Sequence, residues 1–254
     1  AQMTTPFPLV VTLHNLPASR GLAHSALGFI ASRAGQVVCV SQAVASRAPG
    51  KNKRVIPNGI DLARFTLADR RGARRELDLS SDQFVVASAA RLAPEKGIDL
   101  LLQAAAQAPD MTFLIAGSGP DERPLAAKAP KNTRLLGRIE NVERLFAACD
   151  AVAIPSRSEG HGIVALEAMA AGAAVVAARV GGLGETVRHE ETGLLVAPEA
   201  PAEILQALNR LKDHPDLRAR LGDAGREYAL RHADVQSMIG ALEAVYEEEA
   251  PARA

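Results

Sequence analysis

Hydrophobic positions follow two alternating periods along most of this chain. Short runs rich in β-branched residues are followed by glycine or polar breaks, and then by stretches with apolar residues at helical spacing. This alternation predicts βαβ units and a parallel sheet. Before Asn58, the pattern predicts strands at 9–14, 36–41 and 53–57 and one helix at 22–34.

A second and more complete set of elements begins at Phe84. Six strands are predicted, at 84–90, 111–117, 133–137, 151–155, 173–179 and 193–197. Helices are predicted between them at 98–107, 122–129, 142–148, 163–171 and 184–188, and after them at 202–211, 217–231 and 235–248. Six strands with helical crossovers make a whole doubly wound domain, whereas three strands make half of one.

The two sets of elements predict four parts of the chain. Residues 1–61 are expected to form a partial Rossmann-like domain, and the polar, Arg-rich stretch 62–80 is expected to be a connector. Residues 81–200 are expected to form a complete Rossmann-like domain. The remaining helices, in 201–254, are expected to pack on or across the two domains.

Composition excludes some classes of protein. A chain of 254 residues that is 48% apolar can bury a large core without disulfide or metal staples. The 29 basic and 29 acidic residues balance, which disfavours a nucleic-acid-coating protein. Cys39 and Cys149 lie in apolar runs, so we expect reduced core cysteines and a cytoplasmic protein. No apolar stretch is long enough to span a bilayer.

Ligands of open α/β sheets bind beyond the carboxyl ends of the strands, so the residues that follow each strand are the candidates for chemistry. Arg91 ends the strand at 84–90, and Lys96 stands at the start of the next helix. Together they could clamp a diphosphate from two sides. A solvated pair beside a loop is the alternative.

Glycines follow the next strand, in the sequence GSGP. Gly117 and Gly119 would allow a ligand to approach the backbone closely. The third glycine of the dinucleotide fingerprint is missing, and no acidic residue ends the strand at 133–137. Both absences disfavour a nicotinamide-dependent enzyme.

The densest cluster of candidates is SRSEGHGIVALEAMAAG, at 156–172. Glu159 lies in a glycine-rich loop, and Glu167 follows it by eight residues inside the predicted helix. Carboxylates suit sugar hydroxyls because each accepts several hydrogen bonds. The free amides of the first helical turn would point toward a bound anion; they belong to Gly162, Ile163 and Val164. Alternatively, one glutamate is a helix-terminal carboxylate and the other is solvated.

Six stretches carry a resemblance to a known family: VVTLHN (10–15), VIPNGID (55–61), RLAPEKGIDLLLQA (91–104), GSGP (117–120), SEGHGIVALEAMAAGAAVVAARVGG (158–182) and TGLLV (192–196). In order and spacing they resemble the retaining glycosyltransferases of family four, which have the GT-B architecture. In such enzymes two Rossmann-like domains face each other across a cleft. The C-terminal domain binds the nucleotide-sugar donor, and the N-terminal domain binds the acceptor.

The resemblance implies a role for each candidate residue. Arg91 and Lys96 would clamp the diphosphate, Glu159 would contact hydroxyls of the transferred sugar, and Glu167 would contact the ribose. The other implied donor contacts are Gly117, Gly119, Arg138, Ile139 and the amides of Gly162, Ile163 and Val164. His14 would reach the reaction centre. His161 stands where the family usually has an aromatic residue, either as a tolerated variation or as a new catalyst.

The implied reaction is transfer of a hexosyl group from a UDP- or GDP-sugar with retention at the anomeric carbon. The resemblance implies no divalent cation and no cofactor, and no Asp-x-Asp pair ends a predicted strand. One alternative is a donor-binding subunit or truncated chain that is inactive alone. A sugar-nucleotide epimerase or a phosphorylase has less support, because no lysine is placed for a pyridoxal Schiff base.

Two expectations concern partners. Nothing matches the strands and glycine-rich turn that open the family's acceptor domain, so the acceptor site is incomplete unless a partner chain or a second copy supplies the rest; a shortened chain or a gene fragment would explain the gap equally well. The acceptor itself stays open between a glycan, a lipid and a small molecule. Basic residues could give weak contact with anionic lipid at the inner membrane face, or form a solvated connector; they are Lys51, Lys53, Arg54, Arg70, Arg71, Arg74 and Arg75.

Overall fold

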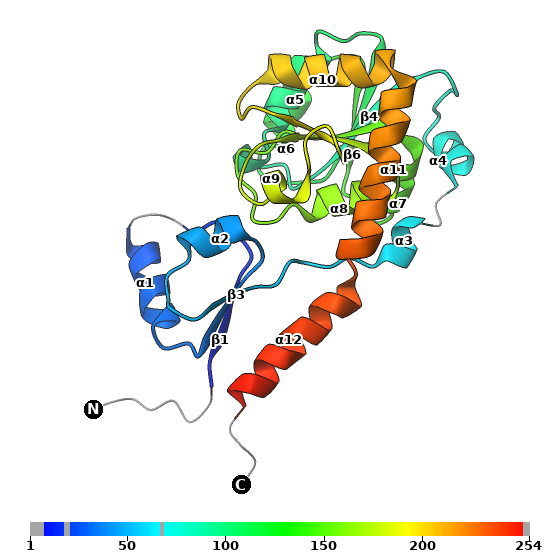
Figure 1. Ribbon diagram of the computed structural model, residues 1–254. Coiled ribbons are helices and arrows are strands. Elements are labelled where there is room, and N and C mark those ends of the chain that lie inside the picture. Colours follow the sequence, from blue (N-terminus) through cyan, green and yellow to red (C-terminus); the bar gives the residue numbers. More distant parts are fainter. Residues whose placement is uncertain (1–7, 18–20, 67–68, 251–254) are drawn as a thin grey trace.

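A computed structural model describes residues 8–17, 21–66 and 69–250 (Figure 1). The outer ends of the predicted parts 1–61 and 201–254, and two residues of 62–80, lie outside this range. The chain forms two separate parallel sheets, one of three strands and one of six. The predicted α/β class and the parallel sheets are therefore confirmed.

The three-stranded sheet is formed by the first part of the chain. Its strands are β1 (Val10–Leu13), β2 (Gln36–Cys39) and β3 (Lys53–Val55), side by side in that order. The crossovers are α1 (Leu22–Ala31) and α2 (Gln42–Arg47). Helix α2 was not predicted, because Val44 is its one large apolar residue and it shows no apolar helical face. Its signal is Ser41, whose side chain accepts a hydrogen bond from the amide of Val44 at 3.1 Å and so caps the helix.

The six-stranded sheet has the strand order β6-β5-β4-β7-β8-β9. These strands are β4 (Phe84–Ala89), β5 (Met111–Ala116), β6 (Thr133–Gly137), β7 (Ala151–Ile154), β8 (Ala174–Ala178) and β9 (Leu194–Val196). This is the order of a doubly wound sheet, in which the chain starts in the middle and builds outward twice. The order in which strands are added reverses between β4 and β7, which makes this place the switch point of the sheet. Arg91 and Ser156, which follow these two strands, therefore lie at the switch point.

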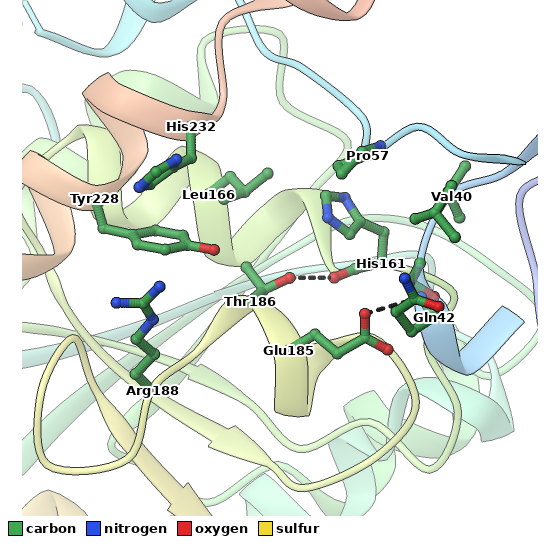
Figure 2. A pocket seen from close by; sticks show the side chains of 12 residues that line it. Val40, Gln42, Pro57, His161, Leu166, Glu185, Thr186, Arg188, Tyr228 and His232 are labelled. Atoms are coloured by element: carbon green, nitrogen blue, oxygen red, sulfur yellow. Dashed lines mark hydrogen bonds between the residues drawn. The ribbon is translucent and has the colours of Figure 1, made fainter. Parts of the chain in front are cut away.

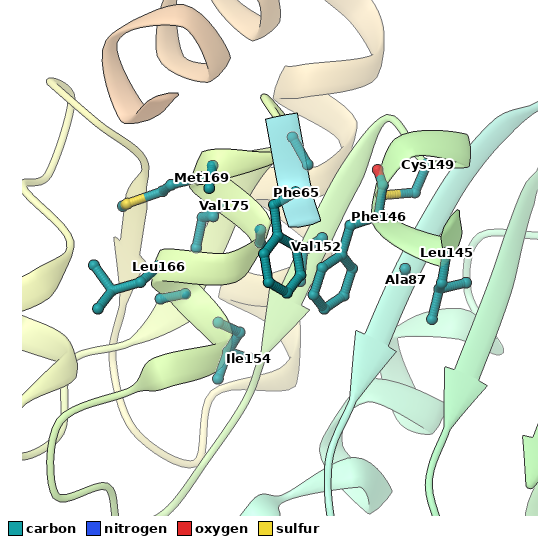
Figure 3. Packing of buried hydrophobic residues seen from close by; sticks show 14 of the residues in the cluster. Phe65, Ala87, Leu145, Phe146, Cys149, Val152, Ile154, Leu166, Met169 and Val175 are labelled. Carbon is teal, nitrogen blue, oxygen red and sulfur yellow. The ribbon is translucent and has the colours of Figure 1, made fainter. Parts of the chain in front are cut away.

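Helices cover both faces of the larger sheet and bury its apolar strands. They are η1 (Pro94–Lys96), α5 (Ile98–Ala105), α6 (Glu122–Lys128), α7 (Val142–Ala148), α8 (Ile163–Ala170) and α9 (Leu183–Thr186). The central strands are buried on both faces, which explains their continuous apolar sequences. Figure 3 shows one of the two cores, where Phe146 packs beside Val152 and Phe65.

The predicted connector 62–80 contains two short helices, α3 (Leu62–Thr66) and α4 (Arg70–Glu76). Phe65 of α3 is only 3% exposed and belongs to the core of the larger sheet. Asp69 caps α4 by accepting hydrogen bonds from the amides of Arg71 and Gly72, both at 3.0 Å. This segment is therefore packed structure attached to the six-stranded half.

Three helices end the described chain: α10 (Pro201–Asp213), α11 (Pro215–His232) and α12 (Val235–Glu249). Helix α11 packs against α8 and β8, whereas α12 crosses back to the smaller sheet (Figure 1). There Val245 packs with Val38 and Ile56. The last described helix thus joins the half of the molecule in which the described chain begins.

The expected basic cluster is not one solvated patch. Arg74 is 6% exposed and donates hydrogen bonds to the carbonyl groups of Gln83 at 2.6 Å and Ala148 at 2.9 Å. Arg70 pairs with Asp150 at 2.8 Å. Elsewhere, Lys53 donates to the carbonyl groups of Ala45 and Ala48, and Arg54 pairs with Glu248. Much of this positive charge is thus used inside the fold.

Two other features of the chain bear on its compartment. Cys39 and Cys149 are both buried and free, as the sequence predicts. Among the helices of the described residues, none has the length and apolar character needed to cross a membrane.

Candidate active site

A cavity of about 250 Å³, here called the cleft cavity, lies between the carboxyl ends of the two sheets. From the larger half it is lined by the predicted residues Lys96, Glu159, His161, Gly162, Ile163 and Val164. From the smaller half it is lined by the predicted His14. The sequence prediction missed Asn15, which follows His14, and Asn58, which follows β3; both line the same cavity.

The ammonium group of Lys96 lies 2.6 Å from Oε1 of Glu159. Both side chains are partly buried, at 24% and 15% exposure. The same glutamate oxygen accepts a hydrogen bond from the hydroxyl of Ser156 at 2.9 Å. Lys96 and Glu159 therefore act on each other directly, which fixes the carboxylate at the carboxyl end of β7.

Gly97 explains why Lys96 reaches Glu159. It has a left-handed backbone conformation with a φ of 64°, and a Cβ placed on it would lie 2.1 Å from the carbonyl oxygen of Pro155. Only glycine allows this approach without displacing the backbone. The turn after η1 consequently packs onto the exit of β7, next to the loop that carries Glu159.

Glycines also bring the Glu159 loop against the smaller half. A Cβ on Gly160 would lie 1.9 Å from the carbonyl oxygen of His14, and one on Gly181 would lie 1.9 Å from that of Glu159. The hydroxyl of Ser41 donates a 2.6 Å hydrogen bond to the carbonyl oxygen of Gly160. The loop is thus held between the two halves by close backbone contacts.

Helix α8 begins at the wall of the cleft cavity. Gly162 caps it with a φ of 88°. Within the described part of the chain, the amides of Gly162, Ile163 and Val164 have no hydrogen-bond acceptor. Free amides at a helix start attract negative charge, so this wall suits an anion.

A second cavity, of about 390 Å³ and here called the strand-end cavity, lies beyond β4, β5 and β6. The predicted residues Arg91, Gly117, Arg138 and Ile139 line it. The guanidinium of Arg91 forms an ion pair with Glu95, and its side chain is 65% exposed. The carboxyl ends of parallel strands share one edge, so this cavity and the cleft cavity lie along the same edge of the larger sheet.

Packing explains the two glycines of GSGP. A Cβ on Gly117 would lie 1.8 Å from the carbonyl oxygen of Ala90, and one on Gly119 would lie 2.3 Å from that of Leu92. Gly119 is not part of the strand-end cavity wall. The chain's own packing therefore requires glycine at both positions, Gly117 also lines the strand-end cavity, and the donor contacts of the two glycines stay a prediction.

Glu167 lies on α8 but lines neither of these two cavities. Burial raises the pKa of this carboxyl to about 7; Arg64 lowers it and Glu143 raises it further. Arg64 itself pairs with Glu143 at 2.8 Å. Glu167 therefore faces charged residues of α3 and α7 from a largely buried position.

His161 separates the cleft cavity from a third cavity, of about 370 Å³, here called the rear cavity (Figure 2). Its buried Nδ1 has no hydrogen-bond partner among the described residues. Burial lowers the pKa of His161, and the nearby carboxylate of Glu185 opposes this shift. The hydroxyl of Thr186 donates a 2.7 Å hydrogen bond to the carbonyl oxygen of His161.

Glu185 makes a contact between the two halves that sequence reasoning missed. Its carboxylate accepts hydrogen bonds from the amide of Gln42 at 2.9 Å and from the amide of Ala43 at 2.6 Å. Glu185 comes from α9 of the larger half, and the two amides begin α2 of the smaller half. Only the approach of the two halves creates this contact, so no local sequence signal could reveal it.

Across the described residues, no group of three or more His, Cys, Asp or Glu side chains is arranged to hold a metal ion. The groups available for chemistry in the two cavities along the sheet edge include the Lys96–Glu159 pair, Arg91, Arg138, His14, His161 and the free amides of α8.

Residues 69–228 match the family described as Glycosyl transferases group 1. The chain belongs to this family. The matched range includes Arg91, Lys96, Glu159 and Glu167, and it begins one residue before α4.

Curated relatives of this glycosyl transferases group 1 member include two bacterial enzymes. One is a GDP-mannose-dependent monoacylated alpha-(1-6)-phosphatidylinositol monomannoside mannosyltransferase of Corynebacterium glutamicum, 38% identical over 68% of this chain and 50% of the relative. Another is a D-inositol 3-phosphate glycosyltransferase of Salinispora arenicola, 38% identical over 76% of this chain and 49% of the relative. The chain spans about half the length of these relatives.

Solved structures of the same architecture cover nearly all of the chain. Anabaena HepE in complex with UDP and glucose is 28% identical, with a TM-score of 0.88 over 94% of this chain and 71% of that one. Sucrose-phosphate synthase from Thermosynechococcus elongatus is 26% identical, with a TM-score of 0.87 over 96% of this chain and 68% of that one. The expected GT-B-like fold is confirmed.

Proposed function

We propose that this chain is a glycosyltransferase that moves a hexosyl group from a nucleoside-diphosphate sugar to an acceptor with retention of anomeric configuration. The observation that carries this proposal is the Lys96–Glu159 pair beside the free amides of α8, in a cavity that also includes His14. A cation, an anion-binding helix start and a carboxylate acceptor are the groups needed to hold a diphosphate and a sugar side by side.

The base of the donor is uracil or guanine in this proposal. One curated relative is named for its dependence on GDP-mannose, and HepE is solved with UDP and glucose. The strand-end cavity would hold the base beside Arg138 and Ile139, with Arg91 at the diphosphate. Glu167 would contact the ribose. Its buried and partly protonated carboxyl can both donate and accept a hydrogen bond.

The proposed role of the protein is to stabilise charge in the transition state. As the bond between the anomeric carbon and the diphosphate breaks, positive charge grows on the sugar ring and negative charge on the departing phosphate. Lys96, Arg91 and the α8 amides would stabilise the phosphate charge because they are fixed in place before reaction. Removing one such group typically costs on the order of 3 kcal/mol of transition-state stabilisation.

The proposal includes neither a divalent cation nor an organic cofactor. Two cationic side chains and a helix start can balance the charge of a diphosphate. Glu159 is held by Lys96 and Ser156 and would accept hydrogen bonds from the sugar hydroxyls. His14 would lie at the acceptor side of the cleft cavity.

The acceptor and any further protein chain belong to the same proposal. The relatives are named for inositol phosphate and phosphatidylinositol mannoside acceptors, which favours a phosphorylated or polyol acceptor over a protein. In this proposal a partner chain or a second copy would complete the acceptor side of the three-stranded half, in which β1 is the outermost strand of one edge among the described residues. Location in the cytoplasm, at or near the inner membrane face, fits these substrates.

Calorimetry with UDP and GDP, followed by turnover of UDP-glucose and GDP-mannose, tests the proposal. We expect one nucleotide to bind and the matching sugar nucleotide to be hydrolysed slowly, or transferred to inositol phosphate, in the presence of EDTA. NMR of the first-formed product should show a retained anomeric configuration. Binding without any turnover would favour the alternative of a donor-binding subunit, and no binding of either nucleotide would refute the proposal.

A further inference from the structure

The rear cavity has no role in the proposed donor site, although it is larger than the cleft cavity. Its walls come from the ends of β2 and β3 in the smaller half and from α8, α9 and α11 in the larger half. Its volume, about 370 Å³, lies within the range of small-molecule sites. The nature of its wall therefore decides what it could bind.

One end of the rear cavity is cationic. The guanidinium of Arg188 lies 5.0 Å from the centre of the Tyr228 ring, and the ring of His232 lies 4.8 Å from the same centre. Figure 2 shows His232 and Arg188 on opposite sides of Tyr228, whose hydroxyl is directed toward Thr186. Of the carboxylates in the described residues, none pairs with Arg188.

Glu185 is the acidic residue of this wall, and its charge is already engaged. Its two oxygens accept hydrogen bonds from the amides of Gln42 and Ala43, and Figure 2 shows the bond to Gln42. The start of α2 thus balances Glu185, while Arg188 keeps its full positive charge. The rear cavity favours an anion at the Arg188 end.

The opposite side of the rear cavity is apolar. Val40, Val55 and Pro57 form this side, and Leu166 lies between it and the cationic end (Figure 2). A planar guanidinium, a phenol and an imidazole at one end match the oxygens of a phosphate monoester, because guanidinium binds phosphate in bidentate fashion. The apolar side matches the C–H face of a sugar or polyol ring. The rear cavity, at about 370 Å³, has room for both the ring and the phosphate.

We propose that the rear cavity binds a monophosphorylated sugar or polyol, with its phosphate on Arg188, Tyr228 and His232. The ring of this ligand would lie against the His161 side, and His161 also lines the cleft cavity. Only one side chain then separates the ligand from the donor sugar. Two sources share this chemistry: an acceptor that receives the hexosyl group, and an effector that changes donor affinity.

The test uses the whole chain at saturating UDP, so that diphosphate sites are filled. Glucose 6-phosphate, inositol 1-phosphate and their unphosphorylated forms are titrated by calorimetry into wild type, Arg188→Gln and the control Arg123→Gln. Arg123 is exposed on α6 and lines none of the three cavities described here. We expect at least one phosphorylated probe to bind, with about tenfold weaker binding in Arg188→Gln and no change in Arg123→Gln.

Equal binding of a probe and its unphosphorylated form would overturn the inference, as would equal affinity in wild type and Arg188→Gln, or no binding of either phosphorylated probe. UDP affinity, measured separately, tests the proposed function. If UDP binds and neither sugar phosphate does, the rear-cavity proposal is wrong and the proposed function stands. Adding a sugar-nucleotide donor distinguishes the sources. A glycosylated probe identifies an acceptor, and an unchanged probe that shifts UDP affinity identifies an effector; both support the site.

Discussion

The ammonium of Lys96 and the carboxylate of Glu159, 63 residues apart in the sequence, lie 2.6 Å from each other at the switch point of the larger sheet. In the proposed reaction these two groups serve different parts of the donor, the diphosphate and the sugar. Because of this contact, the Lys96 ammonium would have to donate hydrogen bonds both to the Glu159 carboxylate and to a phosphate oxygen when the diphosphate binds. Binding of the donor phosphate and positioning of Glu159 are thereby coupled.

Lys96→Ala is expected to weaken UDP binding about 10- to 100-fold, because a hydrogen bond to a charged group contributes roughly 1.5–3 kcal/mol. Uridine lacks the diphosphate, so its affinity should be unchanged. Calorimetry with both ligands measures this difference. Lys128→Ala, on the exposed face of α6, is the matched control. Equal losses for UDP and uridine would show that Lys96 is not a diphosphate ligand.

Glu167→Gln is expected to stabilise the protein at high pH. The pKa of this carboxyl is about 7 in the folded chain and near its ordinary 4.5 when unfolded. The folded state therefore keeps a proton that the unfolded state releases, and stability falls as pH rises from about 4.5 through 7. Glutamine does not titrate, so the variant lacks this loss of stability. Its Tm should exceed that of the wild type by about a few degrees at pH 8 and equal it at pH 4.

The same variant separates stability from binding. Because Glu167 is the proposed ribose contact, Glu167→Gln should also weaken uridine or guanosine binding. Glu122→Gln, at the exposed start of α6, serves as control and should change neither property. A pH-independent change in Tm would contradict the raised pKa, and unchanged nucleoside affinity would contradict the ribose role.

Much of the fold could be predicted from sequence because its strands are long apolar runs with buried faces on both sides. The run at 84–90 and the helix at 163–171 match β4 and α8 to within a residue or two. The short helices α2, α3 and α4 were not predicted because they carry too few large apolar residues to show a helical face: Val44 in α2, Leu62 and Phe65 in α3, and none in α4. Phe65, in the core, was consequently assigned to a connector.

The candidate site was predictable for a different reason. Parallel topology brings the residues after β4 and β7 to one edge, so Lys96 and Glu159 were expected to lie near each other. Their direct ion pair depends on Gly97, whose close contact with Pro155 is tertiary. The Glu185 contact needs both halves in place, and sequence reasoning had no means to find it.

Arg74→Met and Arg71→Met form a matched pair on α4. Arg74 is buried and donates to carbonyl groups and to Asp150, whereas Arg71 is exposed. Removing one partner of a buried network costs about 3–5 kcal/mol. Thermal unfolding should show a large loss of Tm for Arg74→Met and almost none for Arg71→Met. Similar Tm values would mean that α4 is only loosely attached.

His161→Phe is expected to raise Tm. It removes a buried nitrogen without a partner, which costs roughly 1–3 kcal/mol, and the cavities on both sides give the larger ring room. The pKa of His161 is lowered, so below about 6.5 the unfolded state binds a proton that the folded state resists. The gain should therefore increase from pH 7 to pH 5.5. A lower Tm in His161→Phe than in His161→Gln would contradict this account.

Glu185→Ala is expected to loosen the contact between the two halves. The variant leaves the amides of Gln42 and Ala43 without their acceptor, and loss of a helix cap costs about 0.5–2 kcal/mol. Ser41, which donates a hydrogen bond to the carbonyl oxygen of Gly160, would still link the halves at this place. Small-angle scattering should show a larger radius of gyration for Glu185→Ala and a still larger one for the double variant with Ser41→Ala. The control is Glu191→Ala, an exposed residue whose side chain makes no contact with α2. An unchanged radius in the double variant would show that packing of α12 on the smaller sheet suffices to keep the halves together.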